Sequence, residues 1–155
     1  MNAPGREMAM RVSRVLPDAG TDAQVIILRN ADDSEVLPIP AGYAEGNAIR
    51  FASEGIKPPR PMTHDLLKSI LEHVNVKVEK VVIEEVKNGT YYAKIRLKSG
   101  ERRWSIDARP SDAIALALRT DGKIYVAESV MRNRDLDEMD LWLGQLRDND
   151  LDGPK

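Results

Sequence analysis

The dipeptide Asn88-Gly89 places the strongest constraint on the fold of this chain. It lies between two stretches rich in β-branched and aromatic residues, Val76–Val86 and Tyr91–Leu97. Both central residues of a tight type I′ turn need a positive φ, which Asn and Gly adopt readily. The pattern therefore predicts a β-hairpin, so at least part of the sheet must be antiparallel.

A second hairpin is predicted directly after the first, with Ser99-Gly100 as its two-residue turn. In this register Lys98 faces Glu101, and Ile95 lies opposite Trp104 on an apolar face. The other face of the hairpin is polar. It carries Tyr92, Lys94, Arg96, Arg103, Ser105 and Asp107.

Turn residues divide the rest of the chain into further strands and helices. Prolines confine the strand Glu35–Ile39 to a sheet edge, because proline cannot donate a backbone hydrogen bond. In the helix Thr63–Val74, apolar residues from Leu66 onward recur at helical spacing, so we expect a buried stripe. The remaining predicted elements are the strands Met10–Leu16, Gln24–Arg29, Arg102–Ile106 and Lys123–Ala127, and the helices Glu45–Glu54, Pro110–Arg119 and Asp135–Leu146.

This order of elements predicts an α+β fold, with a mixed, largely antiparallel sheet containing hairpins and packed with three to four helices. The unit 35–54 resembles the unit 102–119, since each is an edge-like strand followed by a helix rich in small residues. An internal strand–helix duplication would explain the likeness. We expect one domain over residues 10–151, including the C-terminal amphipathic helix, with a loose leader at 1–9 and a tail at 152–155.

Composition excludes several kinds of site. The chain has no cysteine and only two histidines, His64 and His73, which rules out disulfides, thiolate metal sites and multi-histidine zinc sites. No segment has the roughly 18 to 20 apolar residues of a membrane span, and the first residues lack a signal-peptide pattern. We therefore expect a cytoplasmic protein without membrane contact. No P-loop, dinucleotide fingerprint or nucleophile elbow is present.

Two segments combine the residue types that phosphate chemistry uses, each at the start of a predicted helix. A helix start offers free N–H groups and the positive end of the dipole to an anion, and arginine can bind phosphate through two parallel hydrogen bonds. Carboxylates and histidine can hold a divalent cation or transfer protons. The segments contribute Arg60, Thr63, His64 and Asp65, and Asp107, Arg109, Ser111 and Asp112.

The same residues also suit purely structural roles. Thr63 and Ser111 are good helix N-caps, and an aspartate in the first turn is favoured by the helix dipole. Each arginine could pair with an aspartate of the other segment. From the residues alone both interpretations stay open, although Asp107, at the end of an alternating strand, needs a partner.

Charge is unevenly distributed along the chain. The formal net charge is −2, yet residues 57–110 hold 12 Lys/Arg against 7 Asp/Glu, a net +5. Within this basic stretch, a polar hairpin face could follow a nucleic-acid backbone. A solvated sheet face is the alternative, because aromatic residues make up only 5% of the chain. The expected surface consists of Tyr92, Lys94, Arg96 and Arg103.

The two motif segments resemble those of a known family. RPMTHDLLKSIL (residues 60–71) and IDARPSDAIALALR (residues 106–119) are similar to the paired signatures of the bacterial and plant bifunctional nuclease domain. AEGNAI (residues 44–49) resembles the family's first helix, and IYVAESV (residues 124–130) resembles its closing strand. The resemblance spans about residues 10–151. It implies an α+β domain that tends to self-associate and cleaves DNA and RNA.

From the motifs and the resemblance we expect a nuclease that hydrolyses phosphodiester bonds with help from Mg²⁺ or Mn²⁺, and that forms a homodimer or larger homo-oligomer. The expected catalytic residues are His64, Asp65, Asp107 and Asp112. The expected phosphate-binding residues are Arg60, Thr63, Arg109 and Ser111, and the expected metal ligands are Asp107, Asp112 and Glu45. This hypothesis requires the two segments to meet in space. The alternative is a non-catalytic module that oligomerises or binds an anion or a partner.

Overall fold

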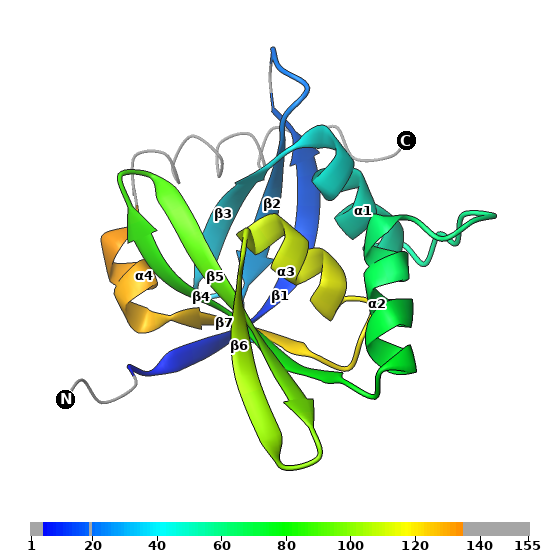
Figure 1. Ribbon diagram of the computed structural model, residues 1–155. Coiled ribbons are helices and arrows are strands. Elements are labelled where there is room, and N and C mark those ends of the chain that lie inside the picture. The colour runs from blue at the N-terminus through cyan, green and yellow to red at the C-terminus, as the bar shows by residue number, and fades with distance from the viewer. Residues whose placement is uncertain (1–4, 19, 135–155) are drawn as a thin grey trace.

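The computed structural model describes residues 5–18 and 20–134, which form a seven-stranded sheet and four helices (Figure 1). The strands are β1 (Glu7–Pro17), β2 (Gln24–Arg29), β3 (Val36–Ala41), β4 (Lys77–Lys87), β5 (Thr90–Ser99), β6 (Arg102–Ala108) and β7 (Lys123–Ala127). The helices are α1 (Tyr43–Ser53), α2 (Thr63–His73), α3 (Pro110–Ala117) and α4 (Glu128–Asn133).

The strand order in the sheet is β3-β2-β1-β7-β4-β5-β6. Neighbouring strands are antiparallel except for β4 and β7, which run parallel. The predicted α+β class with a mixed, largely antiparallel sheet is therefore confirmed. The edge strands β3 and β6 each end a three-stranded meander and lead into a helix, α1 and α3 respectively. This repeated order of elements agrees with the predicted duplication, and the prolines of β3 lie on an edge as expected.

The two hairpins differ in how well they follow the prediction. Asn88 and Gly89 adopt φ angles of 52° and 77°, as the predicted turn requires. In the second hairpin Ser99 faces Arg102, so the predicted register is wrong by two residues. Gly100 becomes the first central residue, with φ 59°, which is where a type II′ turn needs glycine. A shift of two leaves each side chain on its predicted face.

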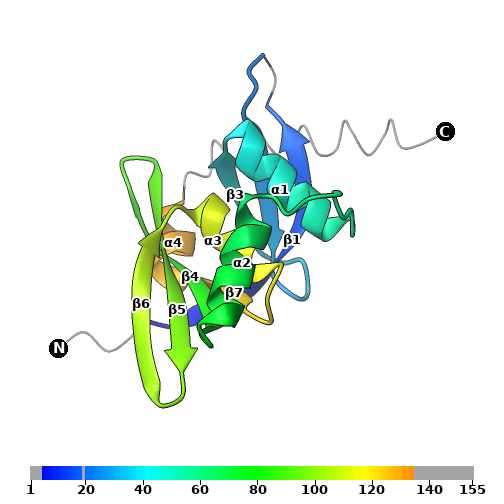
Figure 2. The same cartoon turned by 45° about the vertical axis from the view of Figure 1, so that its right-hand side comes forward.

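Helix α3 lies at the centre of a three-helix group with α1 and α2 (Figures 1 and 2). It packs on β4 and β5, and every residue from Ala113 to Ala117 is buried. Because alanine alternates with larger side chains here, the helix backbone can lie close to the sheet. Helix α4, which the sequence did not predict, packs on β4 and β7 through the buried residues Val130 and Met131.

The start of the first strand also departs from the prediction. β1 begins at Glu7, inside the predicted leader, because residues 7–10 pair with β7. At the other end, the predicted helix Asp135–Leu146 lies outside the described residues. Among the residues that the structure describes, no helix is long and apolar enough to cross a membrane.

The largest departure concerns the apolar stripe of α2, which was predicted to be buried. Of its members only Leu71 packs against the core. Helix α2 instead turns its other side inward, where His64 is only 5% exposed. The stripe faces outward, with exposed fractions of 54% for Leu66, 42% for Leu67, 51% for Ile70 and 59% for Val74.

Candidate functional site

The two motif segments meet where α2 and α3 begin. In the first turn of α2, His64 Nε2 lies 2.9 Å from Oδ1 of Asp112, in the first turn of α3. His64 is buried, whereas the Asp112 side chain is 32% exposed. Since an ionised carboxylate can only accept hydrogen bonds, Nε2 must carry the proton and donate it. The requirement that the segments converge is met by this contact.

Arg109, the N-cap residue of α3, extends the contact to α1. Its Nε donates to Asp112 Oδ2 at 2.8 Å, and its Nη2 donates to Oε1 of Glu45, in the first turn of α1, at 2.7 Å. We call His64, Asp112, Arg109 and Glu45 the helix-start cluster. The Arg109 side chain is 65% exposed, and no described residue accepts a hydrogen bond from Nη1. Part of the guanidinium therefore stays available to an anion.

A second ion pair joins the same three helices. Asp65 Oδ1 accepts a hydrogen bond from Arg119 Nε at 2.7 Å. The Arg119 side chain is only 8% exposed, and its Nη groups donate to the carbonyls of Ala48 in α1 and Ala115 in α3. Arg119 was not predicted as a site residue. The sequence did contain a signal for it, because a charged residue at the end of an otherwise apolar helix needs a partner of opposite charge.

The carboxylates of Asp65 and Asp112 are both held in the ionised form. Burial acts to raise both pKa values, but hydrogen bonds outweigh it and the net pKa of each carboxyl is lowered. For Asp65 the bonds come from the backbone N–H of Met62 and from Arg119; for Asp112 they come from Arg109 and His64. The bonds to Asp112 and Glu45 in turn raise the pKa of Arg109.

The predicted N-caps are wrong for both helices. The N-cap residues are Met62 and Arg109, and neither caps through a side-chain hydrogen bond. Thr63 is exposed and lies inside α2, while Ser111 is buried inside α3. The start of α3 is set instead by Pro110, whose fixed φ suits the first helical position.

A pocket of about 470 Å³ opens beside the helix-start cluster. Its walls come from the end of β3, the turn between β4 and β5, and the start of α3, including Arg109 and Ser111. Gly42, the N-cap of α1, also lines it, and a Cβ there would overlap the Glu45 carboxylate. No described side chain caps the start of α1 or α3. The pocket is therefore bordered by two helix starts and an exposed guanidinium.

Two motif residues lie apart from the cluster. Ala108 faces Ala93 of β5 in the core, so the preceding residue, Asp107, points to the opposite face of the sheet and is exposed. Arg60 is exposed in the loop before α2 and makes no hydrogen bond or ion pair with the described residues. The positions predicted for catalysis and phosphate binding are thus only partly brought together.

The predicted metal ligands do not fit a divalent cation as they are arranged. Asp112 and Glu45 are both bound to the Arg109 guanidinium, and Asp107 lies on another face of the sheet. Within residues 5–18 and 20–134, no group of three or more His, Asp or Glu side chains could hold a metal ion.

The predicted nucleic-acid surface lies on one sheet face, but its charge is largely offset. Arg96 pairs with Glu7 at 3.3 Å, and Arg103 pairs with Glu79 at 3.1 Å. Lys94 of β5 lies opposite Asp107 of the neighbouring strand β6. Tyr92, on the same face, is 43% exposed. The geometry therefore favours the helix-start cluster over this face as the functional site.

Known proteins resemble this chain over the region that contains the site. Residues 26–139, which include both motifs and the helix-start cluster, match the family described as "Bifunctional nuclease domain". An uncharacterized protein of Mycobacterium tuberculosis is 35% identical over 122 residues, 79% of this chain and 73% of its own length. Bifunctional nuclease 1 of Oryza sativa subsp. indica is 30% identical over 115 residues, 72% of this chain but 35% of the rice protein. This chain therefore belongs to the bifunctional nuclease domain family.

Proposed function

We propose that this protein is a nuclease that hydrolyses phosphodiester bonds in DNA or RNA, with the helix-start cluster and its pocket as the active site. The observation that carries the proposal is the position of Arg109. Its exposed guanidinium is held by Asp112 and Glu45 at the edge of a pocket between two helix starts. The names of the plant relatives, bifunctional nucleases, support the reaction class.

Arg109 is proposed to bind the scissile phosphate. Two of the five guanidinium N–H groups are bonded to carboxylates, which fix the orientation of the plane and leave the Nη1 edge for phosphate oxygens. The uncapped helix starts add backbone N–H groups at the same pocket. Such fixed donors would offset the charge that develops on the phosphoryl oxygens as water attacks.

Asp112 is proposed to orient the attacking water and to accept its proton. Each carboxylate oxygen keeps a second lone pair, and the side chain is 32% exposed next to Arg109. Water oxygen would form the new bond to phosphorus, the bond to the leaving oxygen would break, and solvent would protonate that oxygen. His64 is buried behind Asp112 and donates to it, so its role is that of a positioning residue.

No step in this proposal uses a metal ion, because the predicted ligands are not gathered around a common point. Assistance by Mg²⁺ or Mn²⁺ stays a prediction, which assays with each ion and with a chelator would test. We further propose a cytoplasmic location, since a chain without cysteine suits a reducing compartment. A homo-oligomer is also proposed, and sedimentation velocity of the full chain across a dilution series would test it.

Cleavage of labelled single-stranded and duplex oligonucleotides by the purified full chain would test the function. Arg109→Ala should reduce the rate by about 10²-fold to 10³-fold, the usual loss for one transition-state donor. Arg109→Lys should recover little, because lysine lacks the planar fork. Arg11→Ala is the matched control, since Arg11 is 51% exposed and also pairs with an aspartate, Asp33. Unchanged cleavage by Arg109→Ala would contradict the proposed site.

The alternative is a non-catalytic module that binds an anion or a partner. One observation favours it: each charged group of the helix-start cluster already has an opposite charge as partner. Wild-type protein that leaves every oligonucleotide intact, with either ion present, would support this alternative over the nuclease.

A further inference from the structure

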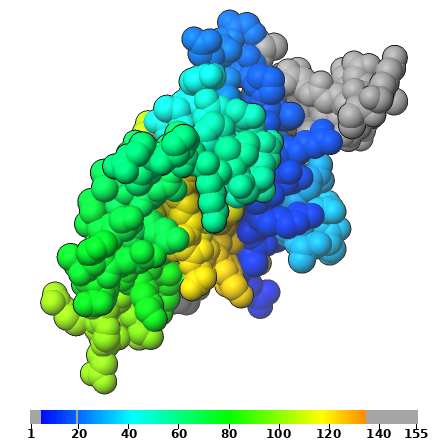
Figure 3. Space-filling view, turned by 90° about the vertical axis from the view of Figure 1, so that its right-hand side faces the viewer, coloured from blue at the N-terminus to red at the C-terminus, as the bar shows by residue number. Residues whose placement is uncertain are grey.

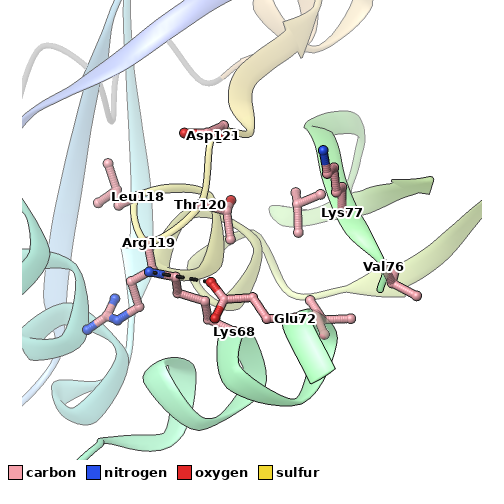
Figure 4. Close-up of a pocket in the computed structure, with 10 residues that line it drawn as sticks. Lys68, Glu72, Val76, Lys77, Leu118, Arg119, Thr120 and Asp121 are labelled. Atoms are coloured by element: carbon pink, nitrogen blue, oxygen red, sulfur yellow. Dashed lines mark ion pairs between the residues drawn. The ribbon is translucent and has the colours of Figure 1, made fainter. Parts of the chain in front are cut away.

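Two of the pockets among the described residues differ in the charges that line them. The larger, of about 470 Å³, lies beside the helix-start cluster, and we call it the cluster pocket. The other, of about 390 Å³, lies between the C-terminal half of α2, the start of β4 and the segment that follows α3 (Figure 4). Figure 3 shows α2, in green, beside that segment, in yellow. The charges in each lining decide which ligands the pocket can bind.

The pocket at the end of α2 carries both signs of charge. Lys68 and Lys77 line it together with Glu72 and Asp121. Figure 4 shows Lys68 paired with Glu72. The two carboxylates would repel a phosphate group, and the two lysines would repel a cation. This lining selects no charged ligand, so the pocket serves below as a control.

The cluster pocket has a charge at one edge only. Of the eleven described residues that line it, Arg109 is the single charged one. The buried residues Ile39 and Ala41 contribute apolar surface, and Tyr91 is the aromatic residue of the wall. A mostly apolar hollow with a few polar groups is the usual form of a small-molecule site. A ligand that fits this pocket has a negative group at one end and an uncharged, largely apolar body at the other.

A buried hydroxyl in the same pocket lacks a partner. Ser111 is only 5% exposed, lines the pocket at the start of α3, and forms no side-chain hydrogen bond with any described residue. A buried polar group without a hydrogen bond costs free energy, and a hydroxyl can donate one bond and accept two. A polar ligand atom at the start of α3 would satisfy it.

We propose that the cluster pocket binds the base of an unpaired nucleotide, the one next to the phosphate that Arg109 holds. A nucleotide has the required form, because its phosphate is anionic and its base is flat and uncharged. Bases stack favourably on aromatic side chains, and Tyr91 is in the wall. A base in a duplex is already stacked and paired, so it enters a pocket only by rotating out of the helix. The inference rests on the proposed nuclease function and narrows its substrates to single strands, loops and bulges.

Binding of mononucleotides tests the pocket without any cleavage. Isothermal titration calorimetry of the purified full chain would compare 5′-AMP and 3′-AMP with ribose 5-phosphate. Stacking of adenine should make the better AMP isomer bind about tenfold more tightly than ribose 5-phosphate. Thr90→Trp should abolish this advantage, because Thr90 is an exposed wall residue and an indole there would fill the pocket. Lys77→Trp is the matched control, an exposed strand residue of the other pocket, and should bind AMP as wild type does.

A second variant, Ser111→Ala, tests the buried hydroxyl. Loss of one hydrogen bond to the ligand should weaken AMP binding by about tenfold. The urea midpoint should change little, because no described residue loses a hydrogen-bond partner. AMP binding that is unchanged in both Ser111→Ala and Thr90→Trp would overturn the proposal.

Cleavage of one labelled sequence as a single strand, a perfect duplex and a duplex with one unpaired nucleotide tests the substrate class. The single strand should be cut about tenfold faster than the perfect duplex, and the third substrate should be cut beside its unpaired nucleotide. Thr90→Trp should slow both reactions, and Lys77→Trp neither. Equal cleavage of single strand and perfect duplex would overturn the base pocket and leave the nuclease function standing. Protein that cleaves nothing but binds AMP through the pocket, with the loss expected for Thr90→Trp, would support the pocket and contradict the nuclease function.

Discussion

Helices α2 and α3 begin with similar motifs but occupy opposite environments. In α3 nearly every residue is buried, and alanines at 113, 115 and 117 let it lie between the sheet and the other two helices. In α2 only His64 is buried, and the apolar stripe faces outward. A helix that is apolar all round belongs in the core, whereas one with a charged side does not. Side-chain size and polarity around the whole helix therefore decided which of the two became central.

The polar motif residues decided how α2 is rotated. His64 finds its partner in Asp112, in the first turn of α3, and Asp65 finds its partner in Arg119, which follows the C-cap of α3. Burying a polar group costs free energy unless it is hydrogen-bonded, and α3 supplies these bonds. The motif side of α2 therefore turns inward, and the larger apolar side chains are left at the surface.

The largest difference in stability between the two helices should appear when the same substitution, isoleucine to alanine, is made in each. Ile114→Ala in α3 removes a side chain that is fully buried, and we expect a loss of about 2–5 kcal/mol in the free energy of unfolding. Ile70→Ala in α2 removes a half-exposed side chain, so the change should stay within about 0.5 kcal/mol. Urea denaturation of dilute protein, where a dimer would be dissociated, measures both. Equal losses would contradict the contrast between the helices.

A smaller effect on stability should appear when the carboxylates that join α2 and α3, Asp65 and Asp112, are titrated with acid. The folded-state pKa values of Asp65 and Asp112 are lowered from the ordinary 3.8, so the unfolded chain binds protons first as pH falls. The stability that this provides is fully present above about pH 3.8 and is lost as pH falls through the folded values. Asp65→Asn should therefore show a shallower fall in its urea midpoint on acidification. An identical fall in wild type and variant would argue against the Asp65 contact.

The smallest effect on the free energy of unfolding is expected at the start of α2. Because the Thr63 side chain is exposed and makes no capping hydrogen bond, Thr63→Ala should change the free energy of unfolding by less than about 0.5 kcal/mol. Loss of a true N-cap would cost about 1 kcal/mol. Asp65→Ala is the comparison variant, because it removes the acceptor of the Met62 N–H and should cost more. A large loss for Thr63→Ala would restore the capping role predicted for it.

Local patterns predicted the secondary structure better than they predicted contacts. Asn88-Gly89 identified its hairpin because the turn depends on two residues alone, and the prolines identified β3 as an edge. The predicted register of the second hairpin was wrong by two residues because Gly100 can occupy more than one position in a turn. The motifs indicated that α2 and α3 converge, yet the partners of Arg109 could not be assigned from spacing, since several acidic residues were available.

Residue types at short separations were enough to predict the class of fold, the places where the chain turns, and membership in the bifunctional nuclease domain family. Long-range packing was needed to establish which helix is central, that Asp107 lies away from the helix-start cluster, and that the apolar side of α2 faces outward. These outcomes depend on competition between burying apolar surface and satisfying charged groups across separations such as the 48 residues between His64 and Asp112. Periodicity within a single helix carries no information about that competition.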